Sequence, residues 1–435
     1  MVTHVAERDQ WRASGLGYFA PGSGPVIGPD GSVYVGNTAG KLIAFSPGGE
    51  LQWTRDTPGR SIGASPVVGL DGSIYVVGVF SAVDHRDGDP HIRNDSTMYR
   101  FAASGSLVWA ASFPDGGPFH WGSGFSTASP NIWRSGTDEV IIVPQVYPTY
   151  GGHEVRLVTF TTTGDQRFNQ EVTNVRDEIT SEVDWTIFVP SLNRWFGLDP
   201  TELVPALNQL ARDAALGMPR VGMFESGRGD PIVVVADNYQ NLVGYTFSLA
   251  DGFRELFREH LTGDVIRMSS PLMFGDHSVI VGQSTDRAWL HFGEPSAQSW
   301  ADLPIPFSGA GPSVIAGDGL LVVARAGAVA SIATYPSRQV TSETYLEAES
   351  IAPAAVSRTH VFVSTVTELV TLDAVGLNVA AEFPWKNGGL STPAISDDGR
   401  VYAVAGDTLY CFGSRVNPLT PHDEELNVHD RIDKG

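Results

Sequence analysis

The stretch Ser23-Gly-Pro-Val-Ile-Gly-Pro-Asp-Gly-Ser-Val-Tyr-Val-Gly36 returns in closely similar form as Ala64-Ser-Pro-Val-Val-Gly-Leu-Asp-Gly-Ser-Ile-Tyr-Val-Val77. Each copy has a small residue before a proline, a β-branched pair, an Asp-Gly turn and an alternating apolar segment. Asp and Gly tolerate the positive φ of tight turns, and alternation with period two is typical of strands. The repeated phrase therefore predicts two strands joined by a tight reversal.

Related phrases open eight units along the chain. The prolines at their starts are Pro25, Pro66, Pro130, Pro219, Pro271, Pro312, Pro353 and Pro393. Four of the seven intervals between them are 40 or 41 residues long, so the longer intervals contain insertions into a fixed frame. A repeat of this length indicates units that bury an apolar face only against their neighbours.

Within a unit, alternating segments such as residues 42–45 and 51–53 are separated by Gly-rich reversals, which predicts a four-stranded antiparallel meander. Eight such sheets arranged radially form an all-β, eight-bladed β-propeller, which leaves only short strand edges. The eighth unit ends at residues 409–412, before an outer strand. We expect the N-terminal segment Asp9-Gln-Trp-Arg-Ala-Ser14 to supply that strand and close the ring.

A tryptophan follows a Gly-containing turn in Gly48-Gly-Glu-Leu-Gln-Trp53 and in Ser104-Gly-Ser-Leu-Val-Trp109. This arrangement resembles the docking motif of propellers related to the pyrroloquinoline quinone (PQQ) enzymes, and the resemblance extends over nearly the whole chain. It implies that each tryptophan, on the outer strand of its blade, packs against the next blade. Phe168, Phe257 and Phe383 stand at comparable places in later units.

The cysteine content argues against quinone chemistry. The alcohol dehydrogenases of the family that the chain resembles use two adjacent cysteines beside the quinone. This chain has one cysteine, Cys411, and no Cys-x-x-Cys-His for covalent haem. We therefore do not expect a PQQ-dependent dehydrogenase. The resemblance points to the non-catalytic branch of the family, whose members include an outer-membrane assembly lipoprotein.

Composition and charge restrict the partners. Of the 435 residues, 42% are apolar and 18% charged, and no apolar run approaches the roughly 20 residues that cross a bilayer. The formal charge of −21 repels nucleic acid and anionic lipid. We expect one propeller domain over residues 1–415, with a protein or a polysaccharide as partner, no nucleic acid and no membrane insertion. The oligomeric state stays open.

The two ends of the chain lie outside the repeats. The N-terminal residues lack the basic head and apolar core of a secretory signal. The chain as written is therefore expected to be cytoplasmic, or exported if a leader has been removed from it. Residues 416–435 form a polar, acidic tail that cannot bury enough apolar surface to fold alone. We expect the tail to be mobile or to lie against the ring or a neighbour.

Insertions at residues 81–96, 113–125 and 173–217 motivate the functional hypotheses. The first lies between the second and third strands of unit two, and residues 147–153 occupy the corresponding place in unit three. Loops at this place emerge on the same face of a propeller as the links between blades. We therefore expect the insertions to gather on one face over blades 2–4.

The longest insertion contains one predicted helix near residues 199–217. Asp199 suits the N-cap, Pro200 the first turn and Gly217 the C-terminal end. Pro205 indicates a kink or a later start of the helix. The helix would either cover its own ring as a lid or bind a partner, and the sequence leaves both interpretations open.

Aromatic residues are concentrated in these insertions. Large aromatic side chains near an Arg are typical of binding hot spots because they exclude water from the contact, although the same side chains could anchor the insertions to the scaffold. The candidate binding residues are Trp121, Tyr147, Tyr150, Trp185, Trp195 and Phe196.

Acidic residues gather in the insertion at residues 81–96. Closely spaced carboxylates with a glycine can wrap a hard cation, so Asp84, Asp87 and Asp89 are candidate ligands for Ca²⁺. Their spacing differs from that of the helix-flanked calcium loop, and His85 and His91 lack the spacing of a zinc protease motif. A solvated polar loop without a metal is the alternative interpretation.

No strong catalytic signature is present, such as Gly-x-Ser-x-Gly at a strand-to-helix turn. Loops from separate blades could still assemble an acid–base site. The candidate catalytic residues are His120, His153, Tyr150, Arg156 and Asp237.

Two hypotheses follow. In the first, the ring is a non-catalytic binding or assembly scaffold whose elaborated face over blades 2–4 binds a protein or an extended polymer. In the second, the same face is the site of a carbohydrate-active hydrolase or lyase. The lack of a catalytic signature favours the first hypothesis.

Overall fold

A computed structural model provides the structure of the chain. The structure describes residues 9–20, 23–58, 61–86, 89–114, 126, 128–135, 138–149, 152–176, 220–225, 231–237, 241–260, 267–268, 271–274, 277–283, 288–293, 300–305, 310–316, 319–324, 328–333, 339–348, 350, 352–385, 388–389, 391–413 and 426–427. All regular secondary structure in these ranges is β-strand. No helix able to span a bilayer occurs within them.

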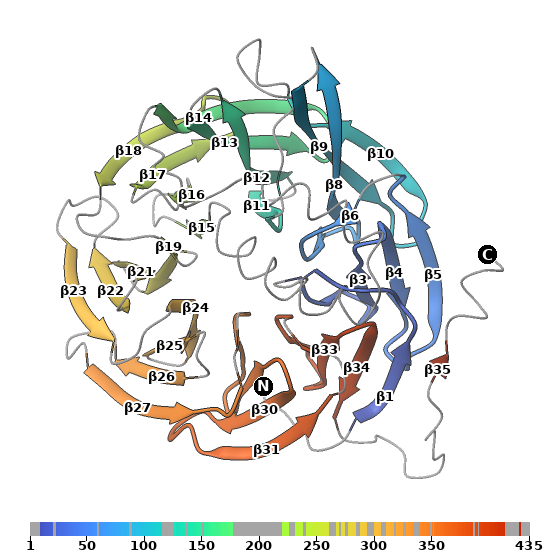
Figure 1. Ribbon diagram of the computed structural model, residues 1–435, viewed down its shortest axis with the longest axis vertical. Helices are drawn as coiled ribbons and strands as arrows, with labels where there is room; N and C mark the ends of the chain where they lie inside the picture. Colours follow the sequence, from blue (N-terminus) through green and yellow to red (C-terminus); the bar gives the residue numbers. More distant parts are fainter. Residues whose placement is uncertain are drawn as a thin grey trace.

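The strands form eight sheets that follow one another around a ring in the order of the sequence (Figure 1). From the innermost strand outward, blade 1 has β2 (Val26–Ile27), β3 (Val33–Gly36), β4 (Lys41–Phe45) and β5 (Leu51–Asp56). Blade 2 has β6 (Ser61–Ile62) with β7 (Val67–Val68), then β8 (Ile74–Arg86), β9 (Asp89–Phe101) and β10 (Leu107–Ser112). Blade 3 has β11 (Asn131–Ser135), β12 (Asp138–Thr149), β13 (Gly152–Thr161) and β14 (Gln166–Arg176).

The other half of the ring repeats this arrangement. Blade 4 has β15 (Arg220–Glu225), β16 (Pro231–Ala236), β17 (Asn241–Ser248) and β18 (Gly252–His260). Blade 5 has β19 (Arg267–Met268) with β20 (Leu272–Phe274), then β21 (His277–Gln283), β22 (Ala288–Gly293) and β23 (Trp300–Ile305). Blade 6 has β24 (Ala310–Ala316), β25 (Gly319–Ala324), β26 (Ala328–Ala333) and β27 (Gln339–Tyr345). Blade 7 has β28 (Ala355–Val356), β29 (His360–Ser364), β30 (Glu368–Asp373) and β31 (Val379–Pro384).

The eighth sheet joins the two ends of the chain. It contains β32 (Ala394–Ile395), β33 (Val401–Ala405) and β34 (Thr408–Phe412), and its fourth strand is β1 (Asp9–Ser14). β1 pairs antiparallel with β34, with Trp11 opposite Cys411. The expected closure by the N-terminal segment is therefore confirmed, and the fold is the expected β-propeller of four-stranded antiparallel sheets. A short piece of the tail, β35 (Leu426–Asn427), adds to β1 as a parallel fifth strand.

The prolines that open the units stand at the starts of inner strands. Pro25, Pro66 and Pro393 each directly precede the inner strand of their blade. Pro312 lies within β24, where the pairing register with β25 shifts between Ala310 and Ser313. Proline lacks a backbone N–H, so strand starts and bulges are the places where a sheet accommodates it.

The apolar core is divided among the junctions between blades. Val33 and Phe45 of blade 1 share one buried cluster with Tyr402 and Cys411 of blade 8. Another cluster joins blades 1 and 2, and the largest runs through blades 2, 3 and 4. At the junctions whose side chains the structure describes, neighbouring sheets therefore bury their apolar faces against each other, as the repeat length predicted.

Tryptophans of the outer strands lock neighbouring blades together. Trp53 of β5 packs on Gly105, in the turn between β9 and β10 of blade 2, and its indole N–H donates to the carbonyl of Ala103 at 2.9 Å. Gly105 has a φ of 81°, and a Cβ placed on it would lie 2.6 Å from the indole. A glycine is required here because both the backbone conformation and the indole exclude a side chain.

The same contact occurs at two further junctions. The Trp109 indole lies on Gly164 and donates to a turn carbonyl of blade 3 at 2.8 Å. The Trp11 indole lies on Gly49 and donates to a turn carbonyl of blade 1 at 3.3 Å. Because Trp11 belongs to β1, the contact that joins blades 1, 2 and 3 also joins blade 8 to blade 1.

The indoles of Trp11 and Trp109 each lie between a tyrosine of their own blade and a phenylalanine of the next. The ring-centroid distances are 6.0 Å for Trp11–Tyr402, 6.1 Å for Trp11–Phe45, 6.1 Å for Trp109–Tyr75 and 6.5 Å for Trp109–Phe160. The tyrosines come from the Val-Tyr-Val type segments of the repeated phrase. The phrase thus supplies one side of each aromatic contact.

A β-bulge marks the docking position on the outer strands. We call the place that Trp11, Trp53 and Trp109 occupy on their outer strands the docking position. Just before it, the outer strand has one residue with no opposite residue on the third strand. These unpaired bulge residues are Gln10, Gln52, Val108, Leu256, Thr341 and Ala380. The position after the bulge is Phe257 in blade 4, Ser342 in blade 6 and Ala381 in blade 7. A bulge turns the following side chain toward a new neighbour, and at Trp11, Trp53 and Trp109 that neighbour is the turn of the next blade.

Phe383 does not occupy the docking position of blade 7, so its predicted equivalence to Trp53 and Trp109 is wrong. It lies two residues beyond Ala381, and its ring packs on Phe412 at 4.9 Å and Tyr410 at 5.5 Å. The reason is topological. The outer strand of blade 8 is β1, so no turn joins its third strand to its fourth, and an indole at residue 381 would have no turn to dock on.

The junction between blades 6 and 7 has no tryptophan at the docking position and uses hydroxyl groups instead. The docking position of blade 6 is Ser342, whose hydroxyl donates to the carbonyl of Val375 at 3.3 Å, and Thr344 donates to the carbonyl of Leu377 at 2.6 Å. Trp53 and Arg55 make the corresponding pair of bonds to blade 2. Leu377 stands where other turns have glycine.

Leu377 itself compensates for the missing indole. It adopts a φ of 57° and is the one non-glycine residue with positive φ in the described ranges. Its side chain is buried in a cluster with Val361 and Leu372, against which Leu346 of the blade 6 side packs. The turn therefore supplies the apolar group that the outer strand of blade 6 no longer supplies.

We expect Trp11→Ala to lower the free energy of unfolding by about 3 to 5 kcal/mol, because it removes a buried indole from the closing junction. Trp53→Ala and Trp109→Ala change stability in the same direction. Val108→Ala, at a half-exposed position of the same strand as Trp109, is the control. Urea titration measures the change, and a Trp11→Ala midpoint equal to that of the control would contradict the docking role.

We expect Leu377→Gly to destabilise the protein by about 2 kcal/mol, since the lost side chain costs about 3 kcal/mol and relief of the left-handed conformation returns about 1 kcal/mol. Adding Ser342→Trp to Leu377→Gly recreates the indole–glycine pair of the other junctions. The double variant should regain most of the loss in urea titration. A double variant no more stable than Leu377→Gly alone would show that the two positions do not compensate for each other.

Candidate functional site

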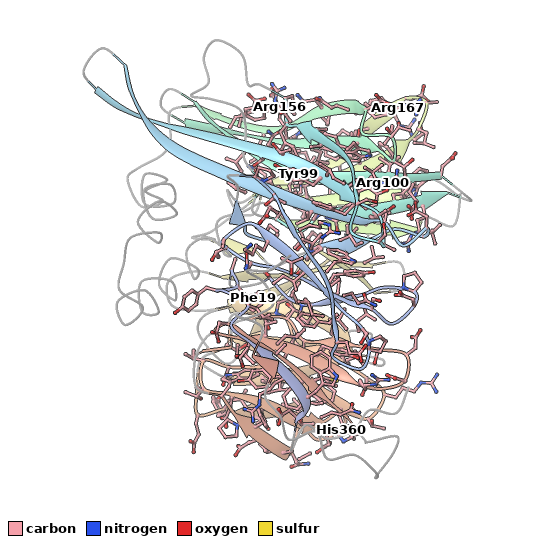
Figure 2. The ribbon with its side chains drawn as sticks, turned by 90° about the vertical axis from the view of Figure 1, so that its right-hand side faces the viewer. Phe19, Tyr99, Arg100, Arg156, Arg167 and His360 are labelled. Carbon is pink, nitrogen blue, oxygen red and sulfur yellow. The ribbon has the colours of Figure 1, made fainter. Side chains whose placement is uncertain are left out.

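Two hairpins extend one face of the ring over blades 2 and 3. The second strand has 4 residues in blade 1 and 5 in blade 8, whereas β8 has 13 and β12 has 12. β8 and β9 form a two-stranded ribbon that projects past the ring (Figure 2, upper left). We call the part of this ribbon formed by residues 80–86 and 89–95 the arm.

The arm differs from the polar loop expected at residues 81–96. Its strands pair continuously from Ile74 opposite Phe101 to Arg86 opposite Asp89. The residues between the strands are Asp87 and Gly88, a dipeptide that favours two-residue hairpin turns. This signal was present in the sequence, but Pro90 and the many charges made the segment resemble a loop.

The register spreads the candidate calcium ligands along the arm. Asp84 lies opposite His91, and Asp89 lies opposite Arg86. Asp87 lies outside the described residues, and the calcium site stays a prediction. Among the side chains that the structure describes, no three His, Cys, Asp or Glu gather around a common point.

A buried polar cluster lies in blade 3 next to the end of β10 of blade 2. The hydroxyl of Tyr147 in β12 lies 2.7 Å from the carbonyl of Pro114 and 2.9 Å from Oε1 of Gln145. The Arg156 guanidinium forms an ion pair with Glu154 and lies over the Tyr147 ring at 5.3 Å. Tyr147, Gln145 and Glu154 are buried. The cluster therefore holds the chain at Pro114, where it leaves β10 for blade 3.

Asp237 caps the turn between β16 and β17 and links blade 4 to blade 3. Its Oδ1 accepts the backbone N–H of Asn241 at 3.0 Å, and its Oδ2 accepts the Asn241 amide at 2.8 Å. The Thr173 hydroxyl of β14 donates to Oδ2 at 2.6 Å. Asn37 holds the corresponding turn of blade 1 through the Lys41 N–H at 2.8 Å. The Asp237 carboxylate thus has the role of a turn cap.

The structure brings together only part of the predicted site. Tyr147 and Arg156 meet in the polar cluster, and Asp237 lies nearby because Thr173 pairs with Val155, the neighbour of Arg156. His153 lies in β13 opposite Pro148. The other candidates lie outside the described residues, as does the predicted helix over residues 199–217, and they are His120, Trp121, Tyr150, Trp185, Trp195 and Phe196.

Sequence reasoning missed Glu154 and Gln145. Both are polar residues in strands that are rich in buried apolar residues, and both are almost fully buried. Buried polar side chains need partners, and Glu154 has one in Arg156 two positions along the same strand. The spacing of Glu154 and Arg156 on one face of a strand was the available signal.

Residues 2–184 match the family model described as "Outer membrane protein assembly factor BamB", a match that spans less than half of the chain. Together with the docking tryptophans and the ring of four-stranded sheets, this match supports the PQQ-like family for that part of the chain. The chain is a β-propeller with PQQ-like repeats. No curated protein matches it in sequence.

Solved propellers share the fold of this PQQ-like propeller at low sequence identity. The computationally designed Ika8 protein is 12% identical, with a TM-score of 0.56 over 92% of this chain and 100% of that one. The Dos1 propeller is 10% identical, with a TM-score of 0.56 over 94% and 95%. Sqt1 of Saccharomyces cerevisiae is 11% identical, with a TM-score of 0.54 over 95% and 100%. These similarities concern the fold alone.

The residues of this PQQ-like propeller do not match a quinone site of the dehydrogenase type. Its one cysteine, Cys411, is buried in β34, paired in register with Trp11 and Tyr402 at the ring closure. Burial raises the pKa of the Cys411 thiol to about 12, so the thiol stays protonated at neutral pH. Cys411 is a core residue, and no second cysteine exists to pair with it.

We expect Cys411 to react with a thiol reagent such as DTNB only after unfolding, because the thiolate is the reactive form. A thiol pKa raised by folding also makes stability fall as pH rises from about 9, where the unfolded thiol ionises, to about 12. Absorbance of the released thiolate at pH 8, with and without urea, measures the difference. Rapid labelling of the folded protein at pH 8 would contradict the burial of Cys411.

Proposed function

We propose that this PQQ-like propeller is a non-catalytic scaffold that binds a protein partner through the face of blades 2–4 that carries the arm. The observation that carries the proposal is the extension of β8 and β9 past the ring (Figure 2). The second strand is much shorter in blades 1 and 8, where it has 4 and 5 residues against 13 in β8. Such a long ribbon adds surface on one side of the ring that closure of the ring does not require.

The polar groups of blades 3 and 4 support a binding role more than a catalytic one. The Arg156 guanidinium is paired with Glu154, and the Asp237 carboxylate accepts hydrogen bonds from Asn241 of its own turn and from Thr173 of β14. Groups held in this way stabilise the scaffold. The carbohydrate-active alternative depends on candidates outside the described residues, and no contact of the described residues favours it.

The family match supports a role in assembly. The matched family model is described as an assembly factor, and its match covers residues 2–184, which include blades 1 and 2 and the arm. The net charge of −21 favours a partner with a basic surface, since opposite charges steer association. A basic protein segment is therefore the partner that the charge and the family description support together.

Shortening the arm tests the proposal. Deleting residues 81–86 and 89–94 leaves Phe80 and Asp95, which are opposite in the register, joined by the original Asp87-Gly88 turn. We expect this short-arm variant to keep the unfolding midpoint of the wild type within a few degrees, because the removed residues lie beyond the pairings with β6 and β10. Circular dichroism on heating measures this.

We expect the short-arm variant to lose a stoichiometric protein partner. The tagged full chain and the tagged variant are recovered gently from the source organism, and native mass spectrometry compares the complexes. Leu107→Ala, at an exposed position of β10 on the ring wall, is the matched control and should keep the partner. Recovery of the same complexes with the short-arm variant would contradict a binding role of the arm.

A further inference from the structure

We infer that the outer edge of β8, at Ser81, Val83 and His85, binds an extended segment of the protein partner as an added β-strand. This inference rests on the proposed function and gives its mode of recognition. Strand addition uses backbone hydrogen bonds for affinity, and it needs a run of edge residues whose N–H and C=O groups point outward and are unpaired.

The register identifies which residues of the arm present their backbone groups outward. In an antiparallel ladder, directly opposite residues alternate between pairs that exchange hydrogen bonds and pairs whose backbone groups point outward. The carbonyl of Ser96 accepts the N–H of Phe113 at 3.0 Å, so Ser96 faces outward on β9. Its opposite residue on β8 is Val79, which therefore also faces outward.

The same alternation continues along the arm. Every second residue of β8 after Val79 presents its N–H and C=O on the outer edge, which gives Ser81, Val83 and His85. Among the strands that the structure describes, β6 pairs with β8 only as far as Val79. The outer edge of β8 thus continues past its last partner for the length of the arm.

The two edges of the arm are unequal. The outward residues of β9 are Asn94, Ile92 and Pro90, and Pro90 has no N–H to donate. Proline at an outward position is a common way of blocking an edge against a further strand. β8 has no proline from Ile74 to Arg86, so its edge offers three successive donors. With respect to the strands that the structure describes, the arm is therefore blocked on its β9 edge and open on its β8 edge.

The arm gains stability from a third strand. A two-stranded ribbon is marginally stable in water, whereas three or more strands hold together. β6 already lies on the open edge at the base of the arm, so an added strand would continue the line that β6 begins. Residues 80–95 contain four Asp and two Arg, which matches the acidity of the whole chain. The occupant we assign is a proline-free, extended segment rich in Lys or Arg from another protein.

The experiment uses a random 12-residue peptide library displayed on phage, selected on the full chain and counter-selected on the short-arm variant. Fluorescence polarisation then measures the affinity of the selected peptides for the full chain, for Val83→Pro and for Ile92→Pro. The two substitutions are matched, because Val83 and Ile92 are opposite in the register and each loses one outward N–H. Pro90 shows that the ribbon accepts proline at such a position.

We expect basic peptides that bind Val83→Pro at least tenfold more weakly than the full chain, and Ile92→Pro within twofold of it. Amide hydrogen exchange of the unsubstituted chain gives a second readout. With peptide bound, exchange should slow at Ser81, Val83 and His85 and stay unchanged at Ile92 and Asn94. Equal affinities for the two variants, protection elsewhere or failure to select any peptide that depends on the arm would overturn the inference.

Co-purification of the natural partner with the short-arm variant and with Val83→Pro tests this inference and the proposed function separately. If the short-arm variant loses the co-purified partner but Val83→Pro retains it at full stoichiometry, the arm binds the partner without strand addition and only the inference fails. If the short-arm variant keeps the partner, the proposed function fails as well.

Discussion

The ring depends on the contact between an outer-strand indole and a glycine turn of the next blade. The contact combines apolar burial with one directed bond, since the indole N–H of Trp11, Trp53 or Trp109 reaches a carbonyl two residues before the turn glycine. Burial alone would let neighbouring sheets slide, because apolar contact has no direction. The directed bond and the absence of a Cβ at the glycine fix the spacing between sheets.

At the junction between blades 6 and 7, the space that an indole fills elsewhere is filled by the side chain of Leu377. An indole with glycine and a serine with leucine place an apolar group in the same gap, from opposite sides. The left-handed conformation persists at Leu377 because the turn must still reverse the chain between β30 and β31 within a few residues. The strain of a non-glycine residue there is offset by the buried side chain that it brings.

Much of the fold was predictable because the repeated phrase combines period-two alternation with Asp-Gly turns, and both signals are local. The closure by Asp9–Ser14 followed from counting the strands of the last unit. Phe383 was misplaced because the docking register depends on a bulge, and a bulge depends on the pairing of two strands. The arm was missed because Asp87-Gly88 stands among residues that also suit a loop. For the site, Tyr147 and Arg156 were named from the sequence and lie together in the structure, whereas Glu154 and Gln145 became visible only when the sheet showed them buried.

The tryptophan junctions and the arm lie in the same part of the ring. Indoles lock blade 8 to blade 1, blade 1 to blade 2 and blade 2 to blade 3, whereas a phenylalanine, Phe168, lies on the turn of blade 4. The arm rises from blade 2, between two indole junctions, and the Tyr147 hydroxyl bonds the Pro114 carbonyl just after β10 of the same blade. A projecting ribbon holds a partner in a defined orientation only if its base does not move. Among the junctions whose side chains the structure describes, the arm therefore stands between two that an indole locks, which suits it to hold a partner.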